Sequence, residues 1–295
     1  MPNHSRGFER FGVHAKSFNG NYRTTGFGLM DLEKIKEQAR TGWGMGEYSG
    51  LSEVLRPAAW ALCDACAVSA GQEVLDVAAG DGNFAIACAE EGASVVASDI
   101  APGMVEQGRA RTRGEDYQIE WLEADAEDLP FEDSRFDCVG SSFGAMIAPR
   151  PRVVAEEMFR VVRPGNTVGM AVWLPEGPIY EMFLLTRTYS EPPPDVPRLE
   201  EWSREEVVHE RFEGLANSIE MERRSLPWSA NSPEDFVASM ERHAPMQAAA
   251  KSNMPAAAYR RLREDLVELA RRWAGGDGPI SMDAPYVLIV ARKRG

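Results

Sequence analysis

The chain has 295 residues, of which 44% are hydrophobic, and its formal net charge at pH 7 is −14. This length suits one large domain, or a core domain with an appended lid. The acidic balance argues against a nucleic-acid partner, because phosphate binding requires a concentrated basic face, and it fits poorly with an anionic membrane surface.

The first 70 residues are expected to form an N-terminal helical segment that acts as a lid. Residues 1–50 are rich in glycine and aromatic residues around a helical stretch, "LMDLEKIKEQAR", and residues 51–70 have the pattern of a helix. The opening "MPNHSRGFER" lacks the apolar segment of a signal peptide, and no run of about 18 apolar residues occurs. We therefore expect a cytoplasmic protein without a transmembrane helix.

Four cysteines are present, at Cys63, Cys66, Cys88 and Cys138, and the first two form a C-x-x-C. No second pair or histidine cluster accompanies them, which disfavours a zinc site. A redox C-x-x-C usually opens a helix, where the helix dipole lowers the pKa of the thiol. This one lies inside the Ala-rich pattern "AAWALCDACAVSA", so we expect small residues that pack in the core.

Between residues 71 and 174, short apolar stretches alternate with helical patterns. Strands are predicted over 73–78, 94–99, 119–125, 136–142 and 167–173, and helices over 83–92, 104–114 and 152–166. This alternation predicts a mostly parallel sheet with helices on both faces, which is the Rossmann-like α/β class.

Residues 175–295 are expected to complete the sheet and to add a helical substrate-binding lid. The proline-rich connector "EPPPDVP" precedes an alternating strand over 218–228, an amphipathic helix over 255–276 and a last strand over 284–293. These two late strands bring the sheet to seven, with the last pair antiparallel. The helical insertion between them would lie near the mouth of a site.

The stretch "VLDVAAGDGN", residues 74–83, ends an apolar strand in a carboxylate and a glycine turn. In an open α/β sheet, ligands bind at the carboxyl ends of the strands. "GDGNFA" fits the loose dinucleotide pattern G-x-G-x-x-A, but short glycine patterns recur by chance. An aspartate lies at the end of each of the first three predicted strands. Asp76 suits an ammonium group, Asp99 suits two ribose hydroxyls, and Asp125 suits an adenine amine. An adenosine with a cationic amino-acid tail fits all three.

Together with "SDIAPGMV", "ADAEDLPF", "FDCVGSSFGAM" and "EEMFRVVRPGN", this stretch resembles a class I S-adenosylmethionine-dependent methyltransferase of the small-molecule branch. The resemblance covers residues 43–173. It implies S-adenosylmethionine as cofactor, S-adenosylhomocysteine as product and no metal. The cofactor-binding residues it implies are Tyr48, Asp76, Ala78, Gly80, Gly82, Asp99, Ile100, Asp125, Ala126 and Ser142.

At the adenosine end, the resemblance implies that Asp99 takes the ribose hydroxyls and that Ile100 packs on the adenine. Asp125 and the amide of Ala126 would read the adenine edge, and Ser142 would lie beneath the sulfonium.

At the methionine end, the backbone of residues 78–80 would line the tail, and Asp76 would help to receive its ammonium. Tyr48 or Trp43 would close over this end, or their segment would simply pack as part of an N-terminal helix. Ala78 departs from the family, which has a glycine there, and we expect alanine to be tolerated with a negative φ. Gly80 and Gly82 remain for close backbone approach.

No catalytic residue is assigned from the sequence. A hydroxyl acceptor would require a general base, whereas a neutral amine or an activated carbon would not. The candidate bases are His14, His209, His243, Glu47 and Glu181. An apolar acceptor pocket could draw on Phe143, Met146, Trp173, Tyr180, Met182 and Phe183, some of which would instead pack in the core.

The expected activity is methyl transfer to a small, partly apolar molecule, in secondary metabolism, with an oxygen, nitrogen or carbon acceptor. One alternative in the same fold uses the cofactor for cyclisation or rearrangement. Others are an NAD-dependent oxidoreductase, for which no Tyr/Lys proton donor is evident, and a non-enzymatic binding module. We expect no nucleic-acid or membrane partner, and a homo-oligomer is left open.

Overall fold

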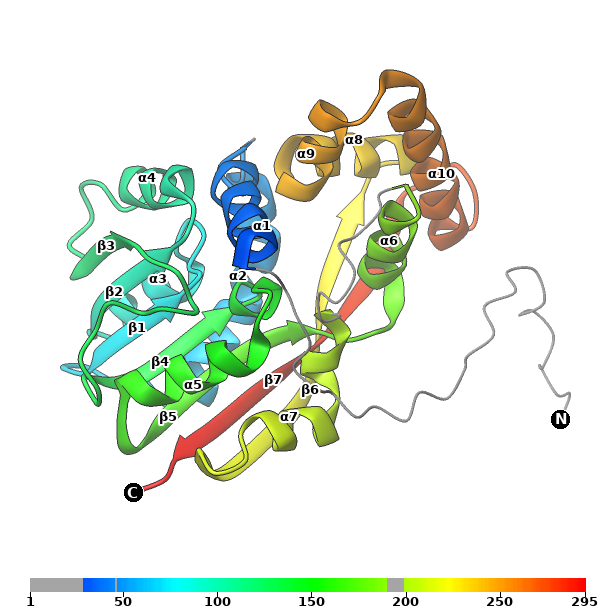
Figure 1. The fold of residues 1–295 in the computed structure, drawn as a ribbon. Helices are drawn as coiled ribbons and strands as arrows, with labels where there is room; N and C mark the ends of the chain where they lie inside the picture. The colour runs from blue at the N-terminus through cyan, green and yellow to red at the C-terminus, as the bar shows by residue number, and fades with distance from the viewer. Residues whose placement is uncertain (1–28, 46, 190–198) are drawn as a thin grey trace, which may run out of the picture.

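The fold is built on one seven-stranded sheet with the strand order β3-β2-β1-β4-β5-β7-β6 (Figure 1). The computed structural model describes residues 29–45, 47–189 and 199–295. The strands are β1 (Glu73–Val77), β2 (Ser94–Asp99), β3 (Ile119–Glu123), β4 (Phe136–Ser142), β5 (Val162–Trp173), β6 (Ala216–Ala230) and β7 (Ile280–Lys293). The predicted α/β class, the seven strands and the antiparallel last pair are confirmed.

Strands β1 to β5 run parallel to one another, and their apolar sequences explain why. Strand β1 lies between β2 and β4, so that Val74 is opposite Val95 on one side and Cys138 on the other. Every residue of β1 after Glu73 is buried, as expected for a strand that helices cover on both faces. Strand β7 then runs antiparallel to both β5 and β6.

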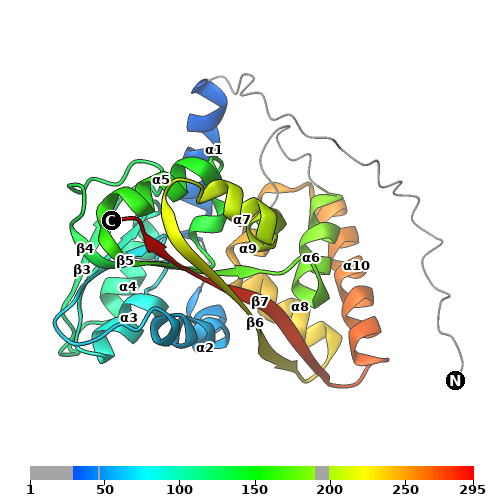
Figure 2. The ribbon, with the colours of Figure 1, turned by 90° about the horizontal axis from the view of Figure 1, so that it is seen from below.

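Helices cover both faces of the sheet, and Figure 2 shows α2 and α3 on one side and α5 and α7 on the other. The helices are α1 (Leu29–Gly42), α2 (Ser49–Ala65), α3 (Asn83–Glu90), α4 (Pro102–Arg111), α5 (Pro151–Val161), α6 (Gly177–Arg187), α7 (Glu205–Arg211), α8 (Pro233–His243), α9 (Pro245–Asn253) and α10 (Ala256–Ala274), with short 3₁₀ turns η1 (Ala145–Ile147) and η2 (Leu199–Ser203). Helix α4 packs on β2 and β3.

The helix predicted over residues 152–166 is too long at its C-terminal end. Helix α5 ends at Val161, and β5 begins at Val162, five residues before the predicted start of that strand. Pro164 explains the difference, because proline disfavours helical backbone in the residue before it. Val162 is instead opposite Phe136 of β4, so the chain enters the sheet directly from the helix.

A group of helices, α6, α8, α9 and α10, lies at one end of the molecule, against the far halves of β6 and β7 (Figure 1). Three of them form the predicted insertion between the last two strands. Helix α1 lies between this group and α4, and it contacts α9. The carboxyl ends of the central strands therefore have helices on several sides.

All four cysteines are buried and free, so the C-x-x-C packs in the core as predicted. The proline-rich connector over residues 191–197 lies outside the described residues. Among the described helices, none has the length and apolar character needed to span a bilayer.

Candidate active site

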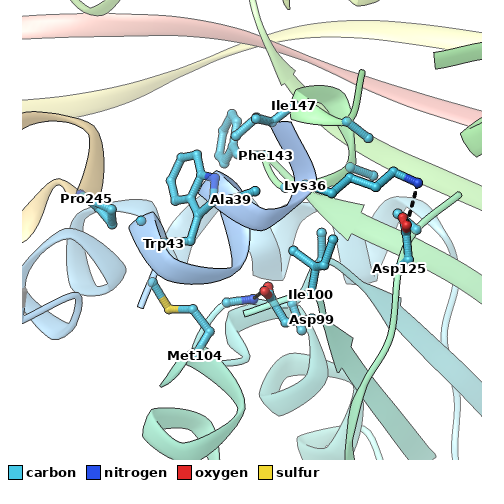
Figure 3. Close-up of a pocket in the computed structure, with 18 of the residues that line it drawn as sticks. Lys36, Ala39, Trp43, Asp99, Ile100, Met104, Asp125, Phe143, Ile147 and Pro245 are labelled. Atoms are coloured by element: carbon cyan, nitrogen blue, oxygen red, sulfur yellow. Dashed lines mark hydrogen bonds and ion pairs between the residues drawn. The ribbon is translucent and has the colours of Figure 1, made fainter. Parts of the chain in front are cut away.

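The carboxyl ends of β1 to β4 open into a cavity of about 350 Å³, and α1 and α9 close its outer sides (Figure 3). This volume falls within the range of about 300–1,000 Å³ that is typical of ligand pockets. Eight of the ten predicted cofactor residues line it: Tyr48, Ala78, Gly80, Asp99, Ile100, Asp125, Ala126 and Ser142. Asp76 and Gly82 do not line the cavity.

Asp76 lies beneath the glycine turn, almost completely buried at 1% exposure. Its Oδ2 accepts a hydrogen bond from the amide of Ala85 in the first turn of α3, at 2.9 Å. Its Oδ1 is buried and has no hydrogen-bond partner among the described residues. Burial raises the pKa of Asp76 well above its usual value of 3.8, and Asp99 and Asp81 raise it further. A buried acceptor without a donor is costly, so this oxygen marks a place where a donor would stabilise the protein.

Ala78 differs from the expectation of a negative φ, since its φ is +53°. The loop after β4 passes directly over this residue. A Cβ atom on Gly144 would lie 2.1 Å from the carbonyl oxygen of Ala78. Left-handed backbone costs a non-glycine residue about 1–2 kcal/mol. Gly80 and Gly82 continue the turn with φ values of +58° and +94°, at no comparable cost.

Asp99 ends β2 and holds the glycine turn in place. Its Oδ2 accepts from the amide of Gly80 at 2.8 Å, and its Oδ1 accepts from the amide of Ala101 at 2.9 Å. Burial raises the pKa of Asp99, although these amide donors oppose the shift. Each carboxylate oxygen has a second lone-pair position, so Asp99 can still accept from a ligand's hydroxyl groups.

Asp125 follows β3 and faces the cavity from the opposite wall. Its Oδ1 accepts from the amide of Glu127 at 2.9 Å, and its Oδ2 lies 2.5 Å from the ammonium of Lys36 (Figure 3). Asp99 and Asp125 thus place two carboxylates at the ends of adjacent strands.

Tyr48 reaches the cavity from the residue before α2. Its ring lies over the turn, because a Cβ atom on Gly80 would be 3.4 Å from the ring edge of Tyr48. Burial raises the pKa of the Tyr48 hydroxyl well above its usual value, and the nearby Asp81 and Asp99 add to the shift. The hydroxyl therefore stays neutral and available as a donor.

Phe143 leaves β4 with a positive φ of +61°. Its amide donates to the carbonyl oxygen of Ala171 at 2.9 Å, and its ring stacks on Trp173 with centroids 4.1 Å apart. The edge of Tyr286 also packs against it, with centroids 5.7 Å apart. These contacts fix the Phe143 ring in the wall of the cavity.

The candidate bases lie elsewhere. His209 is exposed on α7, and the Nδ1 atom of His243 lies 2.7 Å from the carbonyl oxygen of Glu47. Glu181 accepts from the indole of Trp273. None of these residues lines the cavity, and His14 lies outside the described residues.

Of the six residues suggested for an acceptor pocket, Phe143 lines the cavity. Trp173 packs behind Phe143, and Met146 and Met182 are buried in the hydrophobic core. The apolar wall comes instead from Trp43, Ile147, Pro245, Met246 and Ala249, together with Phe143.

Comparison with known proteins identifies the family. A family model described as a methyltransferase domain matches residues 74–165, which include the glycine turn and the ends of β2 to β4. The chain is similar to protein Rv1405c of Mycobacterium tuberculosis (strain ATCC 25618 / H37Rv), with 33% identity over 262 residues that cover 86% of this chain and 94% of that protein. The chain belongs to the class I S-adenosylmethionine-dependent methyltransferases.

Two further similarities bear on this methyltransferase. It is 44% identical over 111 residues to a demethylmenaquinone methyltransferase of Clavibacter sepedonicus, a match that covers 37% of this chain and 45% of that protein. The crystal structure of BH2331 from Bacillus halodurans C-125 has a TM-score of 0.58 and 23% identity, covering 81% of this chain and all of that one. The structural likeness supports the fold alone.

S-adenosylmethionine is the cofactor of this methyltransferase, and its residues fit that molecule. Beneath the turn, the unpartnered Oδ1 of Asp76 provides an acidic group that favours a cationic amine nearby, although Asp76 does not line the cavity. Gly80 brings its backbone to the cavity beneath the ring of Tyr48, and Asp99 ends β2 where a ribose would be read.

Several cavity residues of the methyltransferase were not predicted. Lys36 is 6% exposed on α1, and Pro245 and Met246 come from α9. A lysine in "LEKIKEQAR" has the same local pattern as the exposed charges beside it, so the sequence contains no signal for its burial. The α9 residues lie far along the chain from every motif, and only the tertiary fold brings them to the cavity.

Proposed function

We propose that this methyltransferase transfers the methyl group of S-adenosylmethionine to a small, partly apolar molecule in secondary metabolism. The observation that carries the proposal is the apolar wall of the cavity. Trp43, Phe143 and Ile147 lie together on one side of it, away from the ion pair of Lys36 and Asp125 on another (Figure 3). A planar or apolar acceptor would be desolvated there beside the cofactor.

In this proposal the adenosine is held by the carboxyl ends of β2 and β3. Asp99 accepts from the ribose hydroxyls through the lone pairs that its two amide donors leave open. Ile100 packs on the adenine, and Asp125 and the amide of Ala126 read its edge.

The methionine end is assigned to the turn after β1. The backbone of residues 78–80 and the hydroxyl of Tyr48 line it, and Asp76 compensates the ammonium charge from below. Gly82 supports the turn, and Ser142 lies at the start of the loop that leads to Phe143.

S-adenosylmethionine supplies a methyl group that its sulfonium has already activated, so the protein's task is to position the acceptor and exclude water. Holding two reactants in line can contribute roughly 7–11 kcal/mol. The fixed ring of Phe143 and the helices α1 and α9 are the parts of this chain suited to that task. The proposal assigns no general base.

The relative from Clavibacter sepedonicus supports an apolar acceptor, since its name specifies demethylmenaquinone. The match covers less than half of that protein. We therefore take from it the class of a small molecule with an apolar ring, and not that particular compound.

The proposal is tested with the full chain, S-adenosylmethionine labelled in its methyl group, and a panel of apolar phenols, quinols and amines beside polar sugars and amino acids. We expect label in an apolar product, with an equal amount of S-adenosylhomocysteine, measured by mass spectrometry. Transfer to polar acceptors alone would contradict it. Conversion of the acceptor without label would indicate cyclisation or rearrangement instead.

A matched pair of variants checks that the site is the cavity. Asp99→Ala removes the carboxylate that accepts the two proposed hydrogen bonds from the ribose hydroxyls, each worth about 1.5–3 kcal/mol. S-adenosylhomocysteine should therefore bind at least about 100-fold more weakly by calorimetry. Asp64→Ala, on the exposed side of α2, should leave binding unchanged.

A further inference from the structure

Helix α1 covers the cavity but has little buried surface of its own. Of its side chains over residues 32–42, Leu32 and Lys36 are buried, and the others are partly or fully exposed. Ile35 and Ala39 nevertheless line the cavity, and Trp43 continues the wall just after the helix. Few apolar contacts hold the helix, so another interaction must fix it in this position.

Lys36 supplies that interaction. Its ammonium lies 2.5 Å from Oδ2 of Asp125 and 2.7 Å from Oε2 of Glu127. The side chains of Lys36 and Glu127 are 7% and 0% exposed. Glu127 is itself fixed, because it accepts from the backbone amide of Arg150 at 2.6 Å and from its guanidinium at 2.8 Å. The ion pair therefore joins a lightly packed helix to a firmly held side chain in a place shielded from water.

The charges favour a stable pair. Burial alone would lower the pKa of Lys36, but the hydrogen bonds to Asp125 and Glu127 outweigh it, and the pKa is raised. An ammonium has three N–H donors, and the two carboxylates engage two of them. The third can meet a ligand acceptor, and Oδ2 of Asp125 keeps a lone pair for a ligand donor.

We propose that Lys36 is a positioning residue for the cofactor: its ion pairs latch α1 over the adenine and hold Asp125 toward the adenine amine. This inference rests on the proposed function, in which Asp125 reads the adenine edge. The adenine edge offers an amine donor, which matches the lone pair that Oδ2 of Asp125 keeps beside Lys36.

Just after the C-terminal end of α1, a second contact holds the segment and is suited to act as a hinge. Gly44 packs directly on Gly103, so that a Cβ atom on Gly103 would lie 3.0 Å from the Cα atom of Gly44. This contact lies next to Met104, which lines the cavity. Breaking the pairs of Lys36 would open the adenine end while the contact at Gly44 keeps the helix attached.

The test measures S-adenosylhomocysteine binding to Lys36→Met and to a matched control, Lys34→Met. Lys34 is exposed on the opposite face of the same helix. We expect Lys36→Met to lower the affinity about tenfold or more, with a matching rise in the dissociation rate, because a lost buried charge pair acts mainly on dissociation. The affinity of the Lys34→Met control should stay within about twofold of the wild type, because surface substitutions usually change free energies by no more than about 0.5 kcal/mol.

Calorimetry gives the affinity, and stopped-flow fluorescence gives the dissociation rate. Lys36→Arg, which retains the charge, should keep more of the affinity than Lys36→Met. Unchanged or tighter binding by Lys36→Met overturns the inference, and tighter binding would mean that Lys36 competes with the adenine. A wild-type protein that fails to bind at all would instead refute the assignment of the cavity.

Thermal melting of the unliganded variants reports whether they fold. If Lys36→Met does not fold, Lys36→Gln, which is one atom shorter than lysine but keeps an N–H donor without the charge, takes its place. Hydrogen exchange on the wild type is independent of every variant. Binding of S-adenosylhomocysteine should slow exchange of the amides of α1, and unchanged exchange there overturns the inference.

Discussion

Replacing Asp76 by Asn should make the unliganded protein more stable and weaken its cofactor binding. Oδ2 of Asp76 has the Ala85 amide as its donor, whereas Oδ1 is buried without one among the described residues. Asn would again leave one buried polar atom without a partner, a cost that both proteins share, but a neutral amide is cheaper to bury than a carboxylate. We therefore expect the free energy of unfolding at neutral pH to rise by about 1.4 kcal/mol for each pH unit by which folding raises the pKa of Asp76, with a shift in Tm of about 2–4 °C for each kcal/mol.

The stability that Asp76→Asn gains over the wild type should be smaller at lower pH. The pKa of Asp76 is raised in the folded state, so the unfolded chain loses this proton first as the pH rises above 3.8. The carboxyl group therefore costs the wild type stability progressively between 3.8 and its folded pKa, and costs nothing below 3.8. The advantage of the Asp76→Asn variant over the wild type should shrink as the pH is lowered toward 4.

Urea unfolding of both proteins at several pH values between 4 and 8 measures this difference, with Asp64→Asn on the exposed side of α2 as the control. Calorimetry should show weaker binding of S-adenosylhomocysteine by Asp76→Asn. A variant that is less stable than the wild type at neutral pH, or equally stabilised at every pH, would refute the reasoning that Asp76 is a buried charge awaiting a partner.

Two further substitutions test the walls of the cavity. Gly144→Ala should destabilise the protein by about 1–3 kcal/mol in thermal melts, since the new Cβ atom would meet the carbonyl oxygen of Ala78 at 2.1 Å, whereas Gly278→Ala, in open space, should have little effect. Trp173→Leu removes the ring that stacks on Phe143, so it should raise KM for the methyl acceptor. The affinity for S-adenosylhomocysteine should stay within about twofold of the wild type, because Trp173 supports only the acceptor side. Equal weakening of acceptor binding and S-adenosylhomocysteine binding would contradict this assignment.

The sequence was most informative where local pattern and function coincide. The sequence places Asp76, Asp99 and Asp125 at or just past the carboxyl ends of parallel strands, which meet at one edge of the sheet. Asp99 and Asp125 line the cavity there, whereas Asp76 lies beneath the glycine turn. The backbone of Ala78 could not be predicted in the same way. Its φ is positive although it is not a glycine, and the loop that packs over it at Gly144 lies 66 residues further along the chain, so "VLDVAAGDGN" alone contains no signal of that contact.

Lys36 was unpredictable for a different reason. Its helix has charges on most faces, and burial of one of them depends on Asp125 and Glu127, which the tertiary fold places beneath it. The start of β5 at Val162 could be predicted only in part. Pro164 gave a usable signal, but the helical pattern before it extended far enough to hide the boundary.

Strain and unmet hydrogen bonding coincide at this cavity. Two of the four non-glycine residues with positive φ among the described residues, Ala78 and Phe143, line it, and Oδ1 of Asp76 lies just below it. Such features cost stability and persist only where the surrounding structure enforces them. A cationic ligand above Asp76 that packs against Phe143 recovers part of that cost, and at a concentration 100 times its Kd it adds about 2.7 kcal/mol to the free energy of unfolding. The unliganded fold thus gives up some stability at the site of a cation-bearing cofactor, and for that reason the same residues that weaken the empty protein should govern its binding.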